Sequence, residues 1–423
     1  MKSRTLRWFG AMTLFFGLAI PFRLASAQVA YTVTDLGTFG GTLVFPFDLN
    51  NRSDVVGTAS LPADSVLRAF LWRGGVMSDL GTLGGANSDA VAINQYGQIT
   101  GAAETGLSVT FSSQCFDPQQ QCHAFLWDHG VMKDLGTLPG GESSGAAWIN
   151  SSGRVVGASD NTTSVNPLNG VPDYHAFLWE NGEMKDLGTL GGPASVAQNS
   201  NDSGQVVGNS QFNSDINPDY GRPDFHAFLW DNGKMVDLNA GGGLGGAEGE
   251  AVYINSKRQI VGFATLPGEA SFHAFLWENG VMSDMGTLPG DVFSFASTID
   301  NQGRVVGYSA TEDFSAMSAV LWKNGVITDL NTLIPADSDF YLLGATSINP
   351  RGEITGNGVR LSTGELHGFL LSPIPGSNAS AAHSSESKGA VKPKVPENVR
   401  RVLQRVWPKV PIIQSRGNPD RPN

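Results

Sequence analysis

One four-residue phrase recurs along most of the chain and limits the folds that the chain can adopt. Exact copies of Ala-Phe-Leu-Trp begin at Ala69, Ala124, Ala176, Ala227 and Ala274, and variants begin at Ala319 and Gly368. Successive copies lie 45 to 55 residues apart. A repeat of that length indicates an architecture in which each unit buries its apolar faces against its neighbours.

Each repeat contains signals for four short β-strands. In the third unit, Glu180-Asn181-Gly182 separates the phrase from a second short run that ends in Asp186-Leu187. Asn-Gly between two apolar runs is a strong hairpin signal. A Gly-rich loop, a segment that ends in an Asn-x-x-Gly turn and a Val-Val-Gly strand complete the unit. Four antiparallel strands at this period predict the blades of a β-propeller, since the repeats of an open β-solenoid are usually shorter.

The two ends of the chain set the number of blades. The Asp-Leu or Asp-Met strand occurs seven times between Asp35 and Asp329, and the Val-Val-Gly type of strand also occurs seven times. The chain begins inside a unit, at Tyr31–Leu36, and ends with the missing partner strand, His367–Leu371. We therefore predict an all-β fold, a seven-bladed β-propeller of four-stranded antiparallel blades. The N- and C-terminal strands should close the ring and leave no free sheet edge at the junction.

Histidine precedes the phrase in four units. These residues are His123, His175, His226 and His273. The His-Ala-Phe phrases recur in register over nearly all of residues 31–371, and in this the chain resembles the HAF-repeat family of predicted extracellular proteins. The resemblance implies an exported bacterial protein. It implies no catalytic motif, because the family is defined by its repeat and not by a reaction.

Residues 1–27 have the features of a secretory signal peptide. A basic beginning is followed by 13 apolar residues, Trp8–Ile20, and by a small-residue cleavage site at Ala25-Ser26-Ala27. An uncleaved anchor is the alternative, but so short an apolar stretch spans a bilayer poorly. The sequence thus predicts a mature chain that starts near Gln28 and is secreted, either to the periplasm or to the outside.

The mature chain divides into three parts by composition. Residues 28–373 form the predicted propeller, residues 374–396 form a flexible linker, and residues 397–423 form a basic tail. In the tail, Val399, Val402, Leu403 and Val406 follow the spacing of a short amphipathic helix beside several arginines. Such a helix would contact a membrane surface or the acidic propeller. An unstructured end is a further alternative, because so short a helix is marginal alone.

The charge of the predicted propeller narrows the choice of partners. Residues 28–373 contain 14 Lys and Arg against 36 Asp and Glu, a net charge of −22. This charge repels nucleic acid and anionic membrane surfaces. We therefore expect no nucleic-acid partner and no membrane-embedded propeller, and expect instead an extracellular glycan, peptide or envelope protein as the partner.

The only two cysteines, Cys115 and Cys122, lie close together in one segment. In an exported chain, this arrangement predicts a disulfide. Closing so small a loop would contribute roughly 2–3 kcal/mol on the chain-entropy model. A metal site is disfavoured, because the pair lacks CxxC spacing and the segment offers only His123 beside it.

The repeated histidines and aspartates are expected to be structural. Equivalent third strands of adjacent blades should lie roughly 14 Å apart, too far for their histidines to share one metal ion. The repeated aspartates are likewise too far apart to form a catalytic pair. We predict that the histidines form hydrogen bonds within each blade, and that the aspartates hold turns or accept backbone N–H groups.

Long loops from three consecutive blades form the predicted binding site. Both kinds of tight turn should share one face of the propeller, while the connections 102–122, 158–174 and 209–225 should cluster on the other face. The candidate binding residues are Asp160, Asp173, Tyr174, Asp215, Asp219, Tyr220 and Asp224. Oxygen-rich loops can hold Ca²⁺, but Asn, Asp and Pro also make ordinary turns, and the spacing of a calcium loop is absent. We expect no cofactor, with calcium as the alternative.

A binding function is favoured over catalysis. The sequence predicts a secreted module that binds a glycan, a peptide or a cell-envelope partner. The alternative is a β-propeller enzyme, such as a glycoside hydrolase or lyase, which needs unrepeated acids that converge at the channel mouth. Candidate acids are Glu104, Glu142, Asp173, Asp219 and Glu269. Two facing carboxyls with a strongly raised pKa at that mouth would favour the enzyme.

Overall fold

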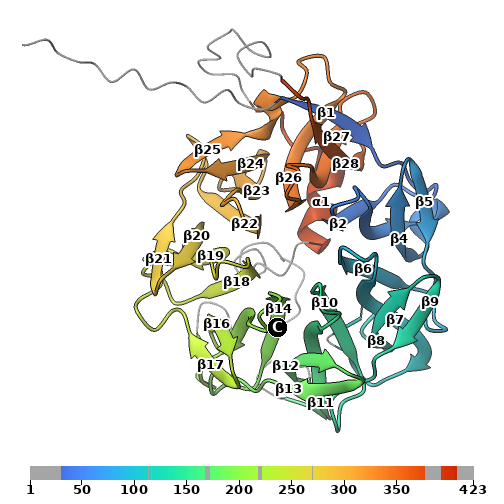
Figure 1. The fold of residues 1–423 in the computed structure, drawn as a ribbon, viewed down its shortest axis with the longest axis vertical. Helices are drawn as coiled ribbons and strands as arrows, with labels where there is room; N and C mark the ends of the chain where they lie inside the picture. The colour runs from blue at the N-terminus through green and yellow to red at the C-terminus, as the bar shows by residue number, and fades with distance from the viewer. Residues whose placement is uncertain are drawn as a thin grey trace, which may run out of the picture.

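Seven four-stranded antiparallel sheets form a ring around a central channel (Figure 1). This computed structural model describes residues 30–112, 114–115, 117–166, 172–217, 222–268, 270–376 and 392–406, with side chains in the last segment described as far as Leu403. It confirms the predicted seven-bladed β-propeller. The predicted signal peptide, 1–27, lies outside the described residues.

The blades are numbered in chain order. Blade 1 contains β2 (Val44–Leu49), β3 (Val55–Ser60), β4 (Leu67–Arg73) and β5 (Val76–Asp79), and blade 2 contains β6 (Ser88–Ile93), β7 (Ile99–Ser108), β8 (Gln120–Asp128) and β9 (Val131–Asp134). Blade 3 contains β10 (Ser144–Ile149), β11 (Val155–Val165), β12 (Pro172–Glu180) and β13 (Glu183–Asp186), and blade 4 contains β14 (Ser195–Ser200), β15 (Val206–Gln211), β16 (Phe225–Asp231) and β17 (Lys234–Asp237).

The remaining blades follow the same order. Blade 5 contains β18 (Gly249–Ile254), β19 (Ile260–Thr265), β20 (Phe272–Glu278) and β21 (Val281–Asp284), and blade 6 contains β22 (Phe293–Ile299), β23 (Val305–Ala310), β24 (Met317–Lys323) and β25 (Val326–Asp329). Blade 7 contains β26 (Phe340–Ile348), β27 (Ile354–Arg360), β28 (Leu366–Pro373) and, as its outer strand, β1 (Tyr31–Asp35). The helices are η1 (Pro62–Asp64), η2 (Leu330–Leu333) and α1 (Glu397–Val406).

The repeated apolar residues pack between blades rather than within one. One core cluster joins Ala92 and Ala124 of blade 2 to Ile149, Val155 and Phe177 of blade 3. Phe177 and Val155 are fully buried. Because each sheet is covered on both faces by its neighbours, the same residue types recur in every blade.

The glycine of the Val-Val-Gly strand is required by close backbone approach. Each innermost strand carries a bulge, as between Ala90 and Ala92, and the glycine lies beside it. A Cβ atom built on Gly101 would lie 1.9 Å from the carbonyl oxygen of Asp89. No side chain fits there, so the bulge and the glycine recur together.

The two ends of the chain close the ring as predicted. β1 pairs antiparallel with β28, with Thr32 opposite Ser372 and Thr34 opposite Leu370. The Leu36 N–H extends this pairing by donating to the Gly368 carbonyl oxygen at 3.0 Å. No sheet edge is left at this junction.

The repeated histidine and aspartate are partners of each other. His175 Nδ1 lies 2.8 Å from one carboxylate oxygen of Asp186, whose other oxygen accepts the Gly188 N–H at 2.7 Å. Equivalent pairs are His123–Asp134, His226–Asp237, His273–Asp284 and His367–Asp35. Partial burial raises the pKa of Asp186, but the His175 and Gly188 hydrogen bonds outweigh it and hold that pKa below its ordinary value. The structure thus confirms that both residues have structural roles.

The asparagines that open the turns between the two innermost strands link the blades on the inner side; Ser53 and Arg258 take the place of the turn glycine in blades 1 and 5. The asparagine ring consists of Asn50, Asn94, Asn150, Asn201, Asn255, Asp300 and Asn349. Each asparagine donates its Nδ2–H to the carbonyl oxygen of the ring residue in the next blade, at 3.0–3.4 Å. Its Oδ1 accepts two N–H groups of its own turn, as Asn50 does from Arg52 and Asp54.

Blade 6 completes the ring with a different residue pair. Asp300 has no amide to donate, and Arg304 supplies the donor instead. Arg304 Nε binds Asp300 Oδ2 at 2.6 Å, and Arg304 Nη2 donates to the Asn349 carbonyl oxygen at 3.2 Å. The ring is therefore continuous through all seven blades.

The predicted disulfide between Cys115 and Cys122 is present, with the two Cα atoms 5.5 Å apart. It links the connection between β7 and β8, which contains Cys115, to Cys122 of β8. The connections predicted as long loops are partly strand. β11 extends to Val165, which pairs with Pro172 at the start of β12. These connections therefore project from the blades as hairpins.

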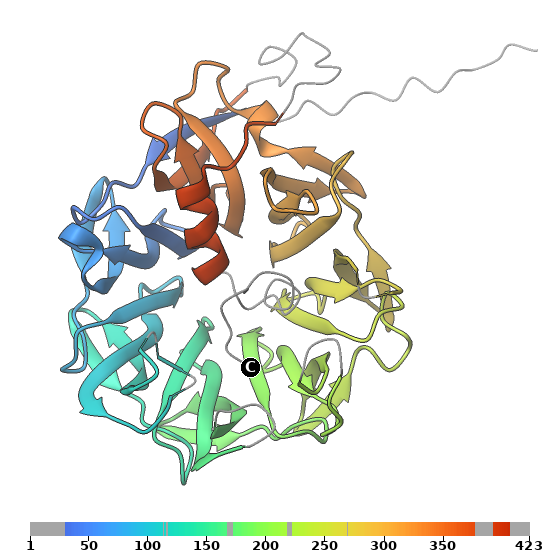
Figure 2. The same cartoon turned by 180° about the vertical axis from the view of Figure 1, so that it is seen from behind.

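The helix α1 lies across the side of the ring that faces away from the viewer in Figure 1, as Figure 2 shows. Val399 and Leu403 are buried against Phe45 and Phe293 of the propeller. Lys392, within the range 374–396 that composition predicts as linker, forms an ion pair of 2.6 Å with Asp291. Within the described residues, no helix is both long and apolar enough to span a membrane.

The asparagine ring leads to a stability prediction in blade 6. We expect R304A to lower the free energy of unfolding by about 3 kcal/mol, because the Asp300 carboxylate, only 3% exposed, loses its charged partner. The double variant D300N/R304Q recreates the Asn94–Gln98 pair of blade 2 and should stay within about 1 kcal/mol of the parent protein. Chemical denaturation measures both changes. Equal destabilisation of the single and double variants would show that the ring does not hold the blades.

Candidate functional site

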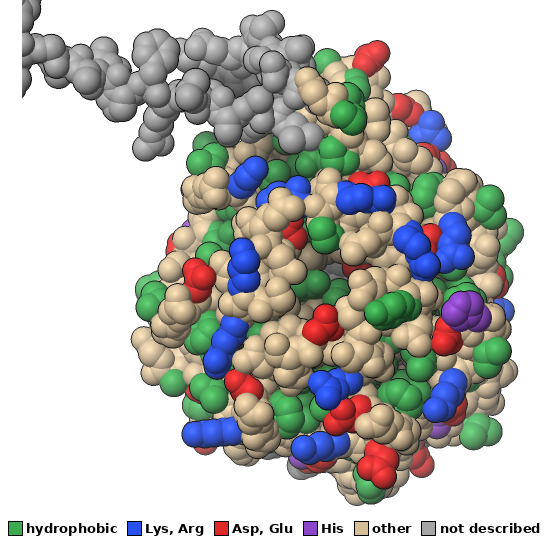
Figure 3. All heavy atoms as spheres, viewed as in Figure 1, with side chains coloured by type: hydrophobic (Ala, Val, Ile, Leu, Met, Phe, Trp, Pro, Cys, Tyr) green, Lys and Arg blue, Asp and Glu red, His purple; other side chains and the backbone are tan. Residues whose placement is uncertain are grey.

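The asparagine ring surrounds a cavity of about 210 Å³ at one mouth of the channel. The central hollow is visible in Figure 3, on a face over which Lys and Arg side chains are spread. The residue after each ring residue lines the cavity. These lining residues are Asn51, Gln95, Ser151, Asp202, Ser256, Asn301 and Pro350. Most therefore present an amide, hydroxyl or carboxylate group to a ligand.

Two aromatic side chains line the same cavity. Trp148 on β10 and Tyr253 on β18 meet edge to face, with ring centroids 5.1 Å apart. Both are half-buried. An apolar ring surface inside a polar cavity is typical of a small-ligand site.

These aromatics occupy a variable position in the repeat. In every blade, one residue of the innermost strand lies opposite the second residue of the Val-Val-Gly type of strand. Around the ring these residues are Asp48, Ala92, Trp148, Asn199, Tyr253, Thr298 and Ser347. The residue types that pair with the next strand on either side of this position are similar from blade to blade. Packing between blades therefore does not require a different residue at this position in each blade.

Asp48 contributes a buried carboxylate to the cavity wall. One of its oxygens accepts the Ile93 N–H at 3.0 Å, and the other accepts the Ser347 hydroxyl at 2.7 Å. Burial raises the pKa of Asp48 to about 6, although these hydrogen bonds oppose the change. Burial also raises the pKa of Tyr253, and the charge of Asp48 adds to that effect. The Tyr253 hydroxyl thus remains a neutral hydrogen-bond donor.

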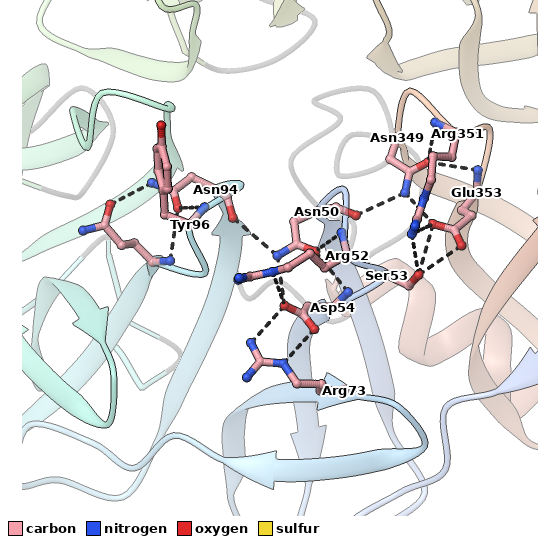
Figure 4. Close-up of polar contacts among 11 residues, drawn as sticks. Asn50, Arg52, Ser53, Asp54, Arg73, Asn94, Tyr96, Asn349, Arg351 and Glu353 are labelled. Carbon is pink, nitrogen blue, oxygen red and sulfur yellow. Dashed lines mark hydrogen bonds and ion pairs between the residues drawn. The ribbon is translucent and has the colours of Figure 1, made fainter.

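Three arginines of blades 1 and 7, which we call the rim, are held by ion pairs outside the cavity lining (Figure 4). Arg73 binds both carboxylate oxygens of Asp54, at 2.7 and 2.9 Å, and Arg52 approaches the same carboxylate at 3.4 Å. Arg351 is held by Glu353 and Ser53, at 2.6 Å in each case. The side chains of all three arginines are more than half exposed. The rim therefore offers positioned, exposed guanidinium groups.

The described residues among those predicted to bind a ligand lie on the opposite face, on the second and third strands of blades 3 and 4 and the connections between them. Asp173 accepts a hydrogen bond from Asn166 Nδ2 at 2.6 Å, and Asp224 accepts one from Asn217 Nδ2 at 2.7 Å. Both pairs span seven residues, so each aspartate closes its own loop. Asp215 is exposed, beside a turn that Asn213 closes. These contacts match the turn-forming role that was the alternative to ligand binding.

Three of the predicted binding residues are brought together. Burial raises the pKa of Tyr174 to about 12, and the charges of Asp160 and Asp173 act in the same direction. Asp160 is almost completely buried. Arg222 and Glu248 lie in the same region, with an ion pair of 2.7 Å between them. Asp219 and Tyr220 lie outside the described residues.

The three acids proposed for an enzyme that the structure describes, Glu104, Glu142 and Asp173, do not line the cavity. Glu104 accepts the backbone N–H groups of Ala86 and Asn87, at 2.9 and 3.0 Å, and so supports a loop. Glu142 is exposed, and Glu269 lies outside the described residues. In the part of the chain that the structure describes, no three His, Cys, Asp or Glu side chains are grouped to hold a metal ion.

The pKa of Asp48 gives a pH-dependent prediction. The unfolded chain releases this proton near pH 4 and the folded chain near pH 6, so Asp48 lowers stability as the pH rises through that interval. We expect the stability of D48N, relative to the parent protein, to increase by about 2 kcal/mol between pH 4 and pH 8. Denaturation curves at both pH values give this difference.

The control for D48N is D54N. Burial raises the pKa of Asp54, but Arg73 and Asn50 outweigh it and the pKa lies below its ordinary value. Asp54 therefore stabilises the fold above pH 4 and loses that effect in acid, so D54N should show the opposite trend. A D48N difference that does not change with pH would contradict the assignment.

Solved structures of three other propellers resemble this one in fold. The β-propeller domain of the Trilobed protease from Pyrococcus furiosus has a TM-score of 0.47 and 11% identity, over 86% of this chain and 100% of that one. TolB from Acinetobacter baumannii has a TM-score of 0.37 and 11% identity, over 83% of this chain and 64% of its own.

The PQQ-bound aldose sugar dehydrogenase of Streptomyces coelicolor has a TM-score of 0.33 and 10% identity, over 82% of this chain and 100% of that one. At these values, the similarity concerns the propeller architecture alone. No family model matches the sequence, and no curated protein matches it.

Proposed function

We propose that the protein is a secreted binding protein that holds a glycan at the channel mouth framed by the asparagine ring. The observation that carries this proposal is the Trp148–Tyr253 pair in a cavity otherwise rich in amide and hydroxyl groups. A sugar ring has apolar C–H faces that pack on aromatic side chains. Its hydroxyl groups pair with amides, hydroxyls and carboxylates such as those of Asn51, Gln95 and Asp202.

The charged rim favours a glycan with acidic groups. Arg52 and Arg73 share the single carboxylate of Asp54, which leaves net positive charge at this point of the rim. A uronate or similar carboxylate on the glycan would be attracted to it despite the acidic propeller body. An acidic oligosaccharide is therefore the preferred ligand class.

Several features support binding outside the cytoplasm. The Cys115–Cys122 disulfide is typical of exported proteins. The predicted signal peptide and the resemblance to HAF-repeat proteins point the same way. Catalysis is not favoured, because both oxygens of Asp48 already accept hydrogen bonds from the protein.

The test is a glycan array followed by calorimetry on the strongest acidic and neutral oligosaccharides. Removal of either aromatic surface, in W148A or Y253A, should weaken binding at least about tenfold, since aromatic contacts dominate such sites. Y174F, on the other face, should bind as the parent protein does. R52Q/R73Q should weaken binding of acidic oligosaccharides and leave neutral ones unchanged.

A second set of variants distinguishes the two faces. Shortening the 158–174 connection should leave both folding and glycan binding intact, because surface loop length costs little. Loss of binding in the shortened variant, together with full binding in W148A and Y253A, would place the site on the long hairpins and overturn the proposal.

A further inference from the structure

On the face opposite the asparagine ring, apolar residues of blades 1, 5, 6 and 7 form one continuous cluster. The part of this cluster that we call the phenylalanine groove consists of Phe45, Phe263, Phe272, Phe293, Phe314 and Met317. The ring centroids of Phe272 and Phe293 are 4.8 Å apart, and those of Phe293 and Phe314 are 4.9 Å apart. The stacked rings form one continuous apolar surface across blades 5 and 6.

The groove is a local departure from the repeat. The positions equivalent to Phe45 in the next three blades are Asp89, Gly145 and Val196. Aromatic side chains at this end of the channel are therefore not required to build a blade. They form a surface that only part of the ring shares.

Phe314 has an unusual backbone conformation at the edge of the groove. Its φ angle is +53°, in the left-handed region that a bulky side chain rarely adopts. Such a conformation persists only where the surrounding contacts impose it, and it occurs preferentially at ligand-contacting segments. Here it belongs to the loop that places the Phe314 ring on Phe293.

The chain's own C-terminal segment occupies the groove. Val395, Val399 and Leu403 are 7%, 2% and 4% exposed and form one apolar stripe at four-residue intervals. Before this stripe, Lys392 Nζ lies 2.6 and 2.8 Å from the two oxygens of Asp291, whose side chain is 1% exposed. The groove thus contacts a cation followed by apolar residues three, seven and eleven positions later.

On the other side of α1, the side chains of Glu397, Asn398 and Arg401 are exposed. Arg400 and Arg401 form ion pairs with Glu397 of the same helix, and the Arg401 side chain is 70% exposed. A helix of this length is marginal in isolation, so its folding depends on the groove.

We propose that the phenylalanine groove is a binding site for an amphipathic helix of a partner protein, with α1 as the occupant that closes it until the partner arrives. The partner's segment has the chemistry of residues 392–403, a lysine or arginine followed by apolar residues at +3, +7 and +11. Helix-in-groove recognition uses this kind of stripe. Asp291 within an acidic propeller selects a basic helix over an acidic one. This site is independent of the glycan site.

The test uses the full chain and a fluorescent peptide of residues 392–406 as the probe. V399D/L403D puts charges on the buried stripe and should release α1, whereas R401Q changes only the exposed side. The released variant should bind the peptide at least about tenfold more tightly than the parent protein or R401Q, because tethered α1 no longer competes. Hydrogen exchange at residues 397–403 should become faster only in V399D/L403D.

The receptor side is tested separately. Adding D291N to the released variant should weaken peptide binding about tenfold without loss of the β-sheet circular dichroism signal. Unchanged exchange in α1 of V399D/L403D, or no peptide binding to that variant, would overturn the proposal. A concentration-dependent dimer of the parent chain would also overturn it and assign the groove to exchange of α1 between two copies.

Discussion

The hydrogen bonds that run from each turn asparagine to the backbone of the next blade set the geometry of the inner ring. Packing between sheets is non-directional and holds neighbouring blades together without defining how their turns meet. The asparagine ring adds direction, because Oδ1 of Asn50 holds its own turn while Nδ2 reaches the carbonyl oxygen of Asn94. In blade 6 the ring residue is Asp300, which has no side-chain amide N–H, and Arg304 donates to the Asn349 carbonyl oxygen in its place. The backbone acceptor is therefore kept in every blade, whereas the side chain that donates to it can change.

A ring built in this way leaves other positions available for function. The asparagines form hydrogen bonds within the fold, whereas the residues that follow them line a cavity, as does the variable inner-strand position in four of the blades. Trp148, Tyr253 and Asp48 all occupy that variable position. At the opposite end of the channel, Phe45 stands where blades 2 and 3 have Asp89 and Gly145, and it belongs to the apolar cluster that receives α1. The two ends thus carry different chemistry on one scaffold.

Much of the fold could be predicted because the repeat itself encodes it. The number of blades, the closing strands, the disulfide and the His175–Asp186 type of pair follow from regular spacing or short-range chemistry. The candidate site was harder to predict from the sequence. The long connections point to Asp173 and Asp224 as binding residues, but both close their own loops. An alignment of the seven repeats could have revealed the channel site, as the one strand position where Trp148 and Tyr253 break the pattern. The docking of α1 depends on phenylalanines from several blades, which no local pattern connects.

We propose that the ligand enters at the asparagine-ring mouth and not at the long hairpins of the other face. Hydroxyl-radical footprinting of the protein, with and without a saturating acidic oligosaccharide, tests this directly because aromatic side chains report their own exposure. Trp148, Tyr253 and Tyr96 line or border the proposed site, whereas Tyr174 and Phe212 lie on the opposite face. Bound ligand should lower the rate of oxidation of Trp148 and Tyr253 and leave that of Tyr174 unchanged. Protection of Tyr174 and Phe212, with Trp148 and Tyr253 still oxidised at the rate of the free protein, would contradict it.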